Sequence, residues 1–420
     1  MTLLEKAHEN YNKVLEYQRQ TNYDTRLDDL IWSQNMRDLN DIFASSKSAE
    51  DALDKIDRTF MYAINFPPEN GRNSGVWRED VPDNPVIREK QIDWLLNKLT
   101  FDLDIIDIQE SPYIHSRNKV SRLNKVLSGN FLRTLSISQE VFKHLGKPAS
   151  IFELGAGCGH QARTFLLQLP DCKYTIVDLP ETLFFSFIHL SLTFPDKKIL
   201  YVTSPEQEID GYDLVFIPAA FANLLEGKSF ELFVNTASMG EMKNEVIHYW
   251  MDLIQNKMKI EKLFTLNRYL NVISGGYACH RIHANECSTS YDNKWKIVNW
   301  ELEPLYCRCP YIDTLHSRYV QIAATRGVAQ EDRSDELLQS ALSEDWHRLT
   351  TPEYMQARMN VLVNDMTMTG TLFKLWESIR LNQNVANVSA MLEYLGRIII
   401  KDQFEEVYYY QDWLSQQKIA

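Results

Sequence analysis

The spacing of apolar residues divides the chain into three regions with different secondary structure. From residue 1 to about residue 147, apolar positions recur every three or four residues, which is typical of helices. The first such set is Leu3, Ala7, Tyr11 and Leu15. Further helices are predicted at 86–99 and 116–145. This amino-terminal region, 1–147, is therefore expected to be helical, and we interpret it as a cap that contributes to an acceptor pocket.

Between residues 148 and 327, short apolar runs alternate with helical patterns. The predicted strands are 150–154, 174–177, 199–202, 213–217, 231–235 and 262–266. Strands that alternate with helices of this length indicate a doubly wound parallel α/β sheet. Two later runs, 295–302 and 318–323, have no helical pattern between them, and they predict an antiparallel hairpin at the sheet edge. We prefer 213–217 to 199–202 as the third strand, because 231–235 then fits the fourth.

The carboxy-terminal region, 328–420, returns to helical spacing. One face there contains Met355, Met359 and Val363, and another contains Met391, Leu395 and Ile399. No function is assigned to this region, and a role in forming a homodimer is one hypothesis for it.

Composition excludes several classes of protein. The chain has 420 residues, which is too long for one typical domain, and 44% of them are hydrophobic. Its net charge of −13 disfavours nucleic acid or an anionic membrane as a partner. No apolar run is long enough to predict a membrane span. Six cysteines do not form a disulfide scaffold, so we expect a reduced, cytoplasmic setting without a secretion signal.

The most informative segment is a glycine-rich turn between a predicted strand and a predicted helix. It reads Ile151-Phe-Glu-Leu-Gly-Ala-Gly-Cys-Gly-His160. Glycines at such a turn allow a ligand to approach the backbone closely, because no Cβ intervenes. In doubly wound folds this edge of the sheet binds ligands. A dinucleotide loop would have glycine at the position of His160, so the spacing disfavours a nicotinamide cofactor.

Two acidic residues flank this loop. Glu153, just before it, would repel a pyrophosphate but suits a ligand with an amine and a sulfonium, such as S-adenosylmethionine. Asp178, at the end of the second strand, is placed to accept hydrogen bonds from two ribose hydroxyls. The plain alternative is a glycine-rich turn with an aspartate that caps the helix beginning at Pro180.

Three strings, 153–159, 174–183 and 234–242, together resemble the sugar O-methyltransferase family of class I S-adenosylmethionine-dependent enzymes. The resemblance covers about residues 110–325. It implies a Rossmann-like methyltransferase core that takes S-adenosylmethionine, releases S-adenosylhomocysteine and methylates a sugar, glycan or nucleotide-sugar hydroxyl. Family members usually have small or aromatic residues in place of Cys158 and His160, so no role is inferred for these two side chains.

The resemblance also implies how the site is divided. Glu153 and the loop backbone would hold the methionine end of the cofactor, Asp178 the ribose, and Leu179 the adenine face, with Pro218 near the adenine edge. The predicted cofactor-binding residues are Glu153, Gly155, Ala156, Gly157, Gly159, Asp178, Leu179, Pro218 and Asn235.

Methylation of a sugar hydroxyl requires alignment of the acceptor and benefits from a general base. The predicted catalytic candidates are Glu241, His280 and His283. The predicted acceptor-binding residues are Arg122, Ser238, Arg268 and Tyr277. An alternative reading of Ser238 and Glu241 is a helix capping box. No spacing of histidine and carboxylate residues predicts a metal site.

Other functions stay open at this point. The acceptor hydroxyl could belong to a lipid or another non-sugar natural product, which a long apolar pocket would favour. The chain could also be a non-catalytic scaffold with a methyltransferase-like core, which a distorted glycine loop would favour.

Overall fold

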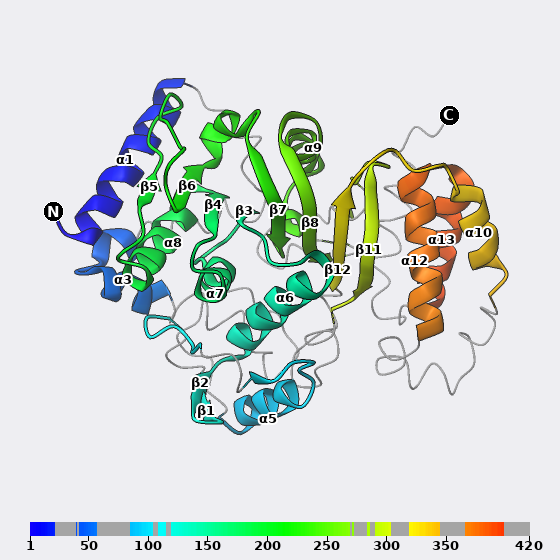
Figure 1. The fold of residues 1–420 in the computed structure, drawn as a ribbon, viewed down its shortest axis with the longest axis horizontal. Helices are drawn as coiled ribbons and strands as arrows, with labels where there is room; N and C mark the ends of the chain where they lie inside the picture. The colour runs from blue at the N-terminus through cyan, green and yellow to red at the C-terminus, as the bar shows by residue number, and fades with distance from the viewer. Residues whose placement is uncertain are drawn as a thin grey trace.

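A computed structural model describes most of the chain (Figure 1). The described residues are 1–21, 39, 42–56, 85–103, 108–114, 119–268, 271–272, 284–285, 290–303, 319–344 and 366–398. Within them, the centre of the molecule is an eight-stranded sheet with the order β11-β12-β8-β7-β3-β4-β6-β5. Its strands are β3 (Ser150–Leu154), β4 (Lys173–Asp178), β5 (Ile199–Tyr201), β6 (Leu214–Pro218), β7 (Ser229–Thr236), β8 (Lys259–Arg268), β11 (Trp295–Leu302) and β12 (Tyr319–Arg326).

Six of these strands are parallel and two are not. Strands β5, β6, β4, β3, β7 and β8 pair in parallel, whereas β12 is antiparallel to both β8 and β11. The predicted doubly wound sheet with an antiparallel edge hairpin is therefore confirmed. Strand β6 pairs with β4 and β5 lies at the edge, so the choice of 213–217 as the third strand is also confirmed.

Helices cover both faces of the sheet. The crossovers through α7 (His160–Gln168) and α8 (Pro180–Thr193) lead toward the β5 edge, and the one through α9 (Asn244–Asp252) leads toward the opposite edge. Because such crossovers are right-handed, α7 and α8 lie on one face and α9 on the other. The short helices η4 (Ala219–Leu225), η5 (Met239–Glu241) and η6 (Leu253–Lys257) complete these connections.

The amino-terminal region is mainly helical where it is described, as predicted. Its helices are α1 (Leu3–Thr21), α3 (Ala49–Ile56), α5 (Pro85–Leu96) and α6 (Gly129–Leu145). Helix α1 packs on α8 through the contact of Tyr11 with Phe184. Phe43, which follows α1 in the chain, also stacks on Phe184, with the ring centroids 4.3 Å apart. The Tyr11 hydroxyl also donates to Glu181 Oε1 at 3.2 Å. This contact joins the amino terminus to the sheet domain.

The prediction of one helix over 116–145 was wrong in its first part. Residues 120–127 form the hairpin of β1 (Val120–Arg122) and β2 (Lys125–Leu127), and α6 begins only at Gly129. Leu123 and Asn124 have φ of 52° and 56°, as a two-residue hairpin turn requires. Ser128 then starts the helix by accepting a hydrogen bond from Phe131 N at 3.0 Å.

The carboxy-terminal helices lie beside the antiparallel edge of the sheet (Figure 1). They are α10 (Ser334–Leu342), α12 (Met366–Leu381) and α13 (Val385–Ile398). Trp300 of β11 contacts Phe373 and Trp376 of α12, with ring centroids 5.6 and 6.0 Å apart. Helix α12 therefore packs against the edge hairpin. The predicted helix at 355–363 lies outside the described residues.

Candidate functional site

The glycine loop connects β3 to α7 at the carboxyl edge of the sheet. Gly155, Gly157 and Gly159 have φ of 73°, 57° and 78°, a region that residues with a Cβ rarely adopt. The loop is fastened at its start, where Gly155 N donates to Val177 O at 2.8 Å. Gly155, Ala156 and Gly157 are half-buried, so this backbone remains accessible from solvent. The predicted strand–turn–helix is confirmed in detail.

Glu153 lies beneath the start of the loop and is fully buried. Its Oε2 accepts a hydrogen bond from the Tyr174 hydroxyl at 2.9 Å, whereas its Oε1 has no partner among the described residues. Burial raises the pKa of Glu153 to about 8, opposed by the Tyr174 hydrogen bond and assisted by the nearby Asp178 charge. A cationic ligand group beside it would therefore stabilise the ionised form of this carboxyl group.

Asp178 ends β4 opposite the loop and holds it in place. Gly157 N donates to Asp178 Oδ2 and Leu179 N donates to Oδ1, each at 2.8 Å. Burial raises the pKa of Asp178 to about 6, although hydrogen bonds from the Thr182 side chain and from these two backbone amides oppose the shift. A carboxylate has about four lone-pair positions, so Asp178 can still accept a hydroxyl donor. Pro218 is its register partner on β6, which places the two predicted residues side by side.

A chain of buried amides joins the ends of β3, β7 and β8. Asn235 donates to Leu154 O and to Ser238 Oγ, both at 2.8 Å. Its Oδ1 accepts from Met239 N at 3.2 Å and from Asn267 Nδ2 at 2.8 Å. Both donors and both lone pairs of the Asn235 amide are thus used inside the protein. Asn235 holds the loop in this way, and its direct contact with a cofactor stays a prediction.

Ser238 lies over the glycine loop, and it precedes the short helix η5 without capping it through its side chain. A Cβ added to Gly155 would overlap with Ser238 Oγ, so the two residues are in close contact. Ala237, just before it, has φ of 61° and turns the chain toward the loop. The alternative of a capping box was wrong, because α9 begins at Asn244 and the Ser238 hydroxyl donates to Leu154 O at 3.2 Å.

A buried histidine supports the loop from behind. His189 Nδ1 lies 2.7 Å from Cys158 O, and its Nε2 lies 2.8 Å from Ser111 Oγ. A carbonyl oxygen only accepts, so Nδ1 carries the proton and Nε2 accepts from the serine. Burial lowers the pKa of His189 to about 3, which keeps the ring neutral. Neither His189 nor Tyr174 was predicted as a site residue, because each reads in sequence as a core position.

The remaining predicted residues are only partly placed. Arg122 lies in the β1–β2 hairpin, where its guanidinium pairs with Asp93 at 2.8 Å and Glu89 at 3.3 Å of α5. The backbones of Glu241 and Arg268 end η5 and β8 at the carboxyl edge of the sheet, and their side chains are not described. Tyr277, His280 and His283 lie outside the described residues.

Comparison with known proteins gives fold-level similarity only. No family model matches the chain, and no curated protein matches it. The pyocyanin biosynthetic protein PhzM is 10% identical with a TM-score of 0.32, over 47% of this chain and 56% of that one. Human N-acetylserotonin methyltransferase, solved with S-adenosylmethionine, is 13% identical with a TM-score of 0.29, over 47% and 52%. The chain thus spans about half the length of these two proteins.

A third solved structure is matched over nearly its whole length. The N-methyltransferase NodS from Bradyrhizobium japonicum WM9, in complex with S-adenosylhomocysteine, is 12% identical with a TM-score of 0.32, over 56% of this chain and 98% of that one. None of the helices in the described residues combines the length and apolar character that crossing a membrane requires.

Proposed function

We propose that this chain is a methyltransferase that binds S-adenosylmethionine at the β3–α7 loop. The observation that carries the proposal is the fully buried Glu153, whose Oε1 has no partner among the described residues, directly before a glycine loop that is fastened to Asp178. A buried carboxyl group of this kind fits the ammonium group of a methionine moiety, because a charged partner would offset its desolvation.

The donor groups around the loop fit the rest of the cofactor. Asp178 has a lone-pair position left for a ribose hydroxyl, and it lies beside Pro218, which would border the adenine. Leu179 is half-buried and would pack on the adenine face. The exposed backbone of Gly155–Gly157 admits close approach of a ligand. When bound, the cofactor would supply an electrophilic methyl group on a sulfonium.

The protein would then have two tasks, which are to orient an acceptor hydroxyl and to remove its proton. Glu241 is our first candidate for the general base, because η5 follows Ser238, which lies on the loop. His280 and His283 are further candidates. Ser238, Arg268, Tyr277 and Arg122 are proposed to bind the acceptor. In the transfer, the acceptor oxygen would bond to the methyl carbon as the carbon–sulfur bond breaks and leaves S-adenosylhomocysteine, and the base would take the hydroxyl proton.

We further propose that the acceptor is a hydroxyl of a sugar, glycan or nucleotide-sugar. The support is the resemblance of the strings 174–183 and 234–242 to sugar O-methyltransferases. The structure adds that the second string forms the amide chain and the contact of Ser238 with the loop. Acceptor and donor sites would therefore share this segment.

The first experiment is calorimetric titration of the protein with S-adenosylhomocysteine, with NAD as the control ligand. We expect saturable binding of S-adenosylhomocysteine, no binding of NAD, and at least tenfold weaker binding by Asp178→Ala, which loses the ribose acceptor. Absence of binding in folded protein would contradict the proposal and favour the scaffold hypothesis.

The acceptor is tested separately. Methyl transfer from labelled S-adenosylmethionine is measured with a panel of nucleotide-sugars and free sugars, and with lipid and polyketide hydroxyls as the competing class. Glu241→Gln should lower kcat by about 100-fold or more while leaving S-adenosylhomocysteine affinity unchanged, as expected for a general base. Transfer only to the non-sugar panel would overturn the sugar proposal and keep the methyltransferase one.

A further inference from the structure

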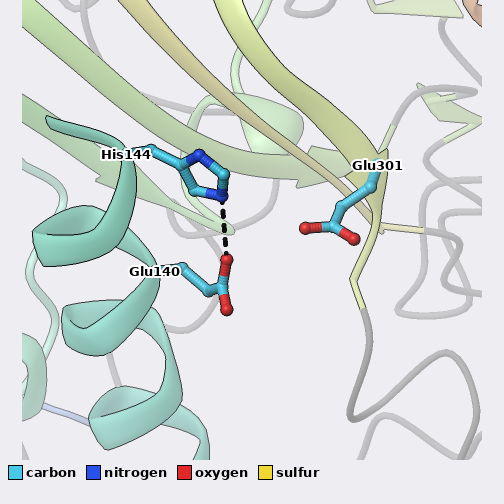
Figure 2. Close-up of side chains that lie close together, drawn as sticks. All are labelled: Glu140, His144 and Glu301. Atoms are coloured by element: carbon cyan, nitrogen blue, oxygen red, sulfur yellow. Dashed lines mark hydrogen bonds and ion pairs between the residues drawn. The ribbon is translucent and has the colours of Figure 1, made fainter. Parts of the chain in front are cut away.

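The helix α6 and the edge strand β11 bring three metal-ligating side chains together. Donor atoms of Glu140, His144 and Glu301 lie within 4.8 Å of one another. Among the residues that the structure describes, no other three histidine, cysteine or acidic side chains come together in this way. Figure 2 shows the two helix residues and Glu301 facing the same space. No metal site was predicted, because the third ligand is 157 positions after His144 in the sequence.

The two helix ligands share one side of α6 by spacing alone. Glu140 and His144 are four residues apart, so they lie one above the other. Glu140 is 5% exposed, and its Oε2 lies 3.2 Å from His144 Nε2. Two ligands of a tetrahedral zinc ion with bonds of about 2.1 Å are separated by about 3.4 Å. The two groups are hydrogen-bonded to each other at this separation, and a bound ion would replace that hydrogen bond with little change in their distance.

Glu301 is held in position by neutral groups. Gln321 Nε2 and Asn299 Nδ2 both donate to its Oε1, at 2.5 and 3.0 Å. The other oxygen, Oε2, accepts no hydrogen bond from a described residue, and Glu301 forms no ion pair with one. An outer carboxamide that orients a ligating carboxylate is a recurring feature of metal sites. The arginine on the same side of α6, Arg133, is paired with Glu303 at 3.2 Å.

The geometry leaves room for an ion at bonding distance. Three atoms within 4.8 Å of one another share a point that lies within about 2.8 Å of each. Bonds of about 2.1 Å then require movements of less than about 1 Å, which side-chain torsions provide. Lys143 also lies 3.3 Å from Glu140 Oε2, but its side chain is 60% exposed and can turn to solvent.

We propose that Glu140, His144 and Glu301 bind a divalent transition-metal ion of the Zn²⁺ type. One imidazole and two carboxylates form a mixed nitrogen and oxygen set, and the two negative charges balance a divalent cation. The ion would fasten α6, which leads directly into β3, to the edge hairpin. This site is separate from the glycine loop, and it does not depend on the proposed methyltransferase activity.

The test uses untagged, EDTA-dialysed full-length protein titrated with Zn²⁺ by calorimetry and with Co²⁺ by visible absorption. We expect about one ion per chain and ligand-field bands from bound Co²⁺. Glu301→Gln and His144→Ala should each weaken binding at least about tenfold. Glu301→Gln keeps the shape of the side chain and its amide contacts, so it isolates the charge.

Matched controls are Glu336→Gln and His248→Ala, which change exposed residues of α10 and α9. Both should retain wild-type affinity and stoichiometry. Absence of saturable binding would refute the site. Binding that stays within twofold of wild type in Glu301→Gln would also refute it, because the ion would then lie elsewhere.

Discussion

The substitution Glu153→Gln should remove the loss of folding free energy that occurs when the buried Glu153 carboxyl group ionises. The folded-state pKa of Glu153 is about 8, against an ordinary value of 4.5. The folded protein therefore holds this proton more tightly than the unfolded chain does. The stability that comes from this tighter proton binding is complete below pH 4.5. It declines as pH rises from 4.5 to about 8, and it is absent at higher pH.

The magnitude follows from the shift. A displacement of about 3.5 units corresponds to roughly 5 kcal/mol when Glu153 is fully ionised, at 1.36 kcal/mol per unit. Between pH 6 and pH 9, the free energy of unfolding of Glu153→Gln should rise relative to wild type by on the order of 3 kcal/mol. Glutamine is isosteric with the protonated acid and still accepts from Tyr174, so the variant does not disturb packing.

The assay is urea-induced unfolding of both proteins at pH 6, 7, 8 and 9. Glu226→Gln is the control, because Glu226 is exposed. Its difference from wild type should stay within about 1 kcal/mol across this range. If the curves of Glu153→Gln and wild type run parallel from pH 6 to 9, Glu153 is not a buried protonated acid, and the reasoning fails.

Four other predictions follow from the same site. Binding of S-adenosylhomocysteine near pH 7 should release close to one proton, because the ligand ammonium group favours the ionised form of Glu153. Calorimetric titration in two buffers of different ionisation enthalpy measures the number of protons released. Identical binding heats in the two buffers would contradict this prediction. Gly155→Ala should lower the free energy of unfolding by about 3 kcal/mol, since the methyl group meets Ser238 and φ is positive; a loss under about 1 kcal/mol in chemical denaturation would contradict this. Gly157→Ala has open space around it, so its stability loss should be only about 1 kcal/mol while S-adenosylhomocysteine affinity falls at least tenfold; unchanged affinity would place the cofactor elsewhere. Asn235→Asp keeps the shape but loses both amide donors, and should cost about 1–3 kcal/mol by urea unfolding; a neutral result would mean that the amide chain is not structural.

The place and the backbone conformation of the loop could be predicted from local sequence. The strand-to-helix turn needs positive φ values, and the glycines at 155, 157 and 159 adopt them readily. That requirement is local, so it is visible in the sequence. Glu153 and Asp178 follow from the same logic, since parallel strands end at one edge of a sheet. The two apolar runs 295–302 and 318–323 likewise predicted the edge hairpin within a few residues, because no helical pattern lies between them to make a parallel crossover.

Tertiary structure decided which polar side chains support the loop. Asn235 and Ser238 were predicted to bind ligands, and the structure gives them a supporting role as well, because the ends of β3, β7 and β8 meet where these groups hydrogen-bond to one another. His189 looked like a core residue, yet it bonds to Cys158 O behind the loop. No local pattern could predict these pairs, because each joins residues from separate elements.

The same reason applies to the proposed metal ligands. The spacing of Glu140 and His144 is a helical property that the sequence contains. Glu301 joins them only because the antiparallel hairpin returns along the sheet and brings the Glu301 side chain of β11 close to α6. The sequence by itself determined the sheet, its glycine loop and the acids beside it, since these depend on neighbours along the chain. Partners that are distant along the chain were decided by the order of strands and the packing of helices upon them.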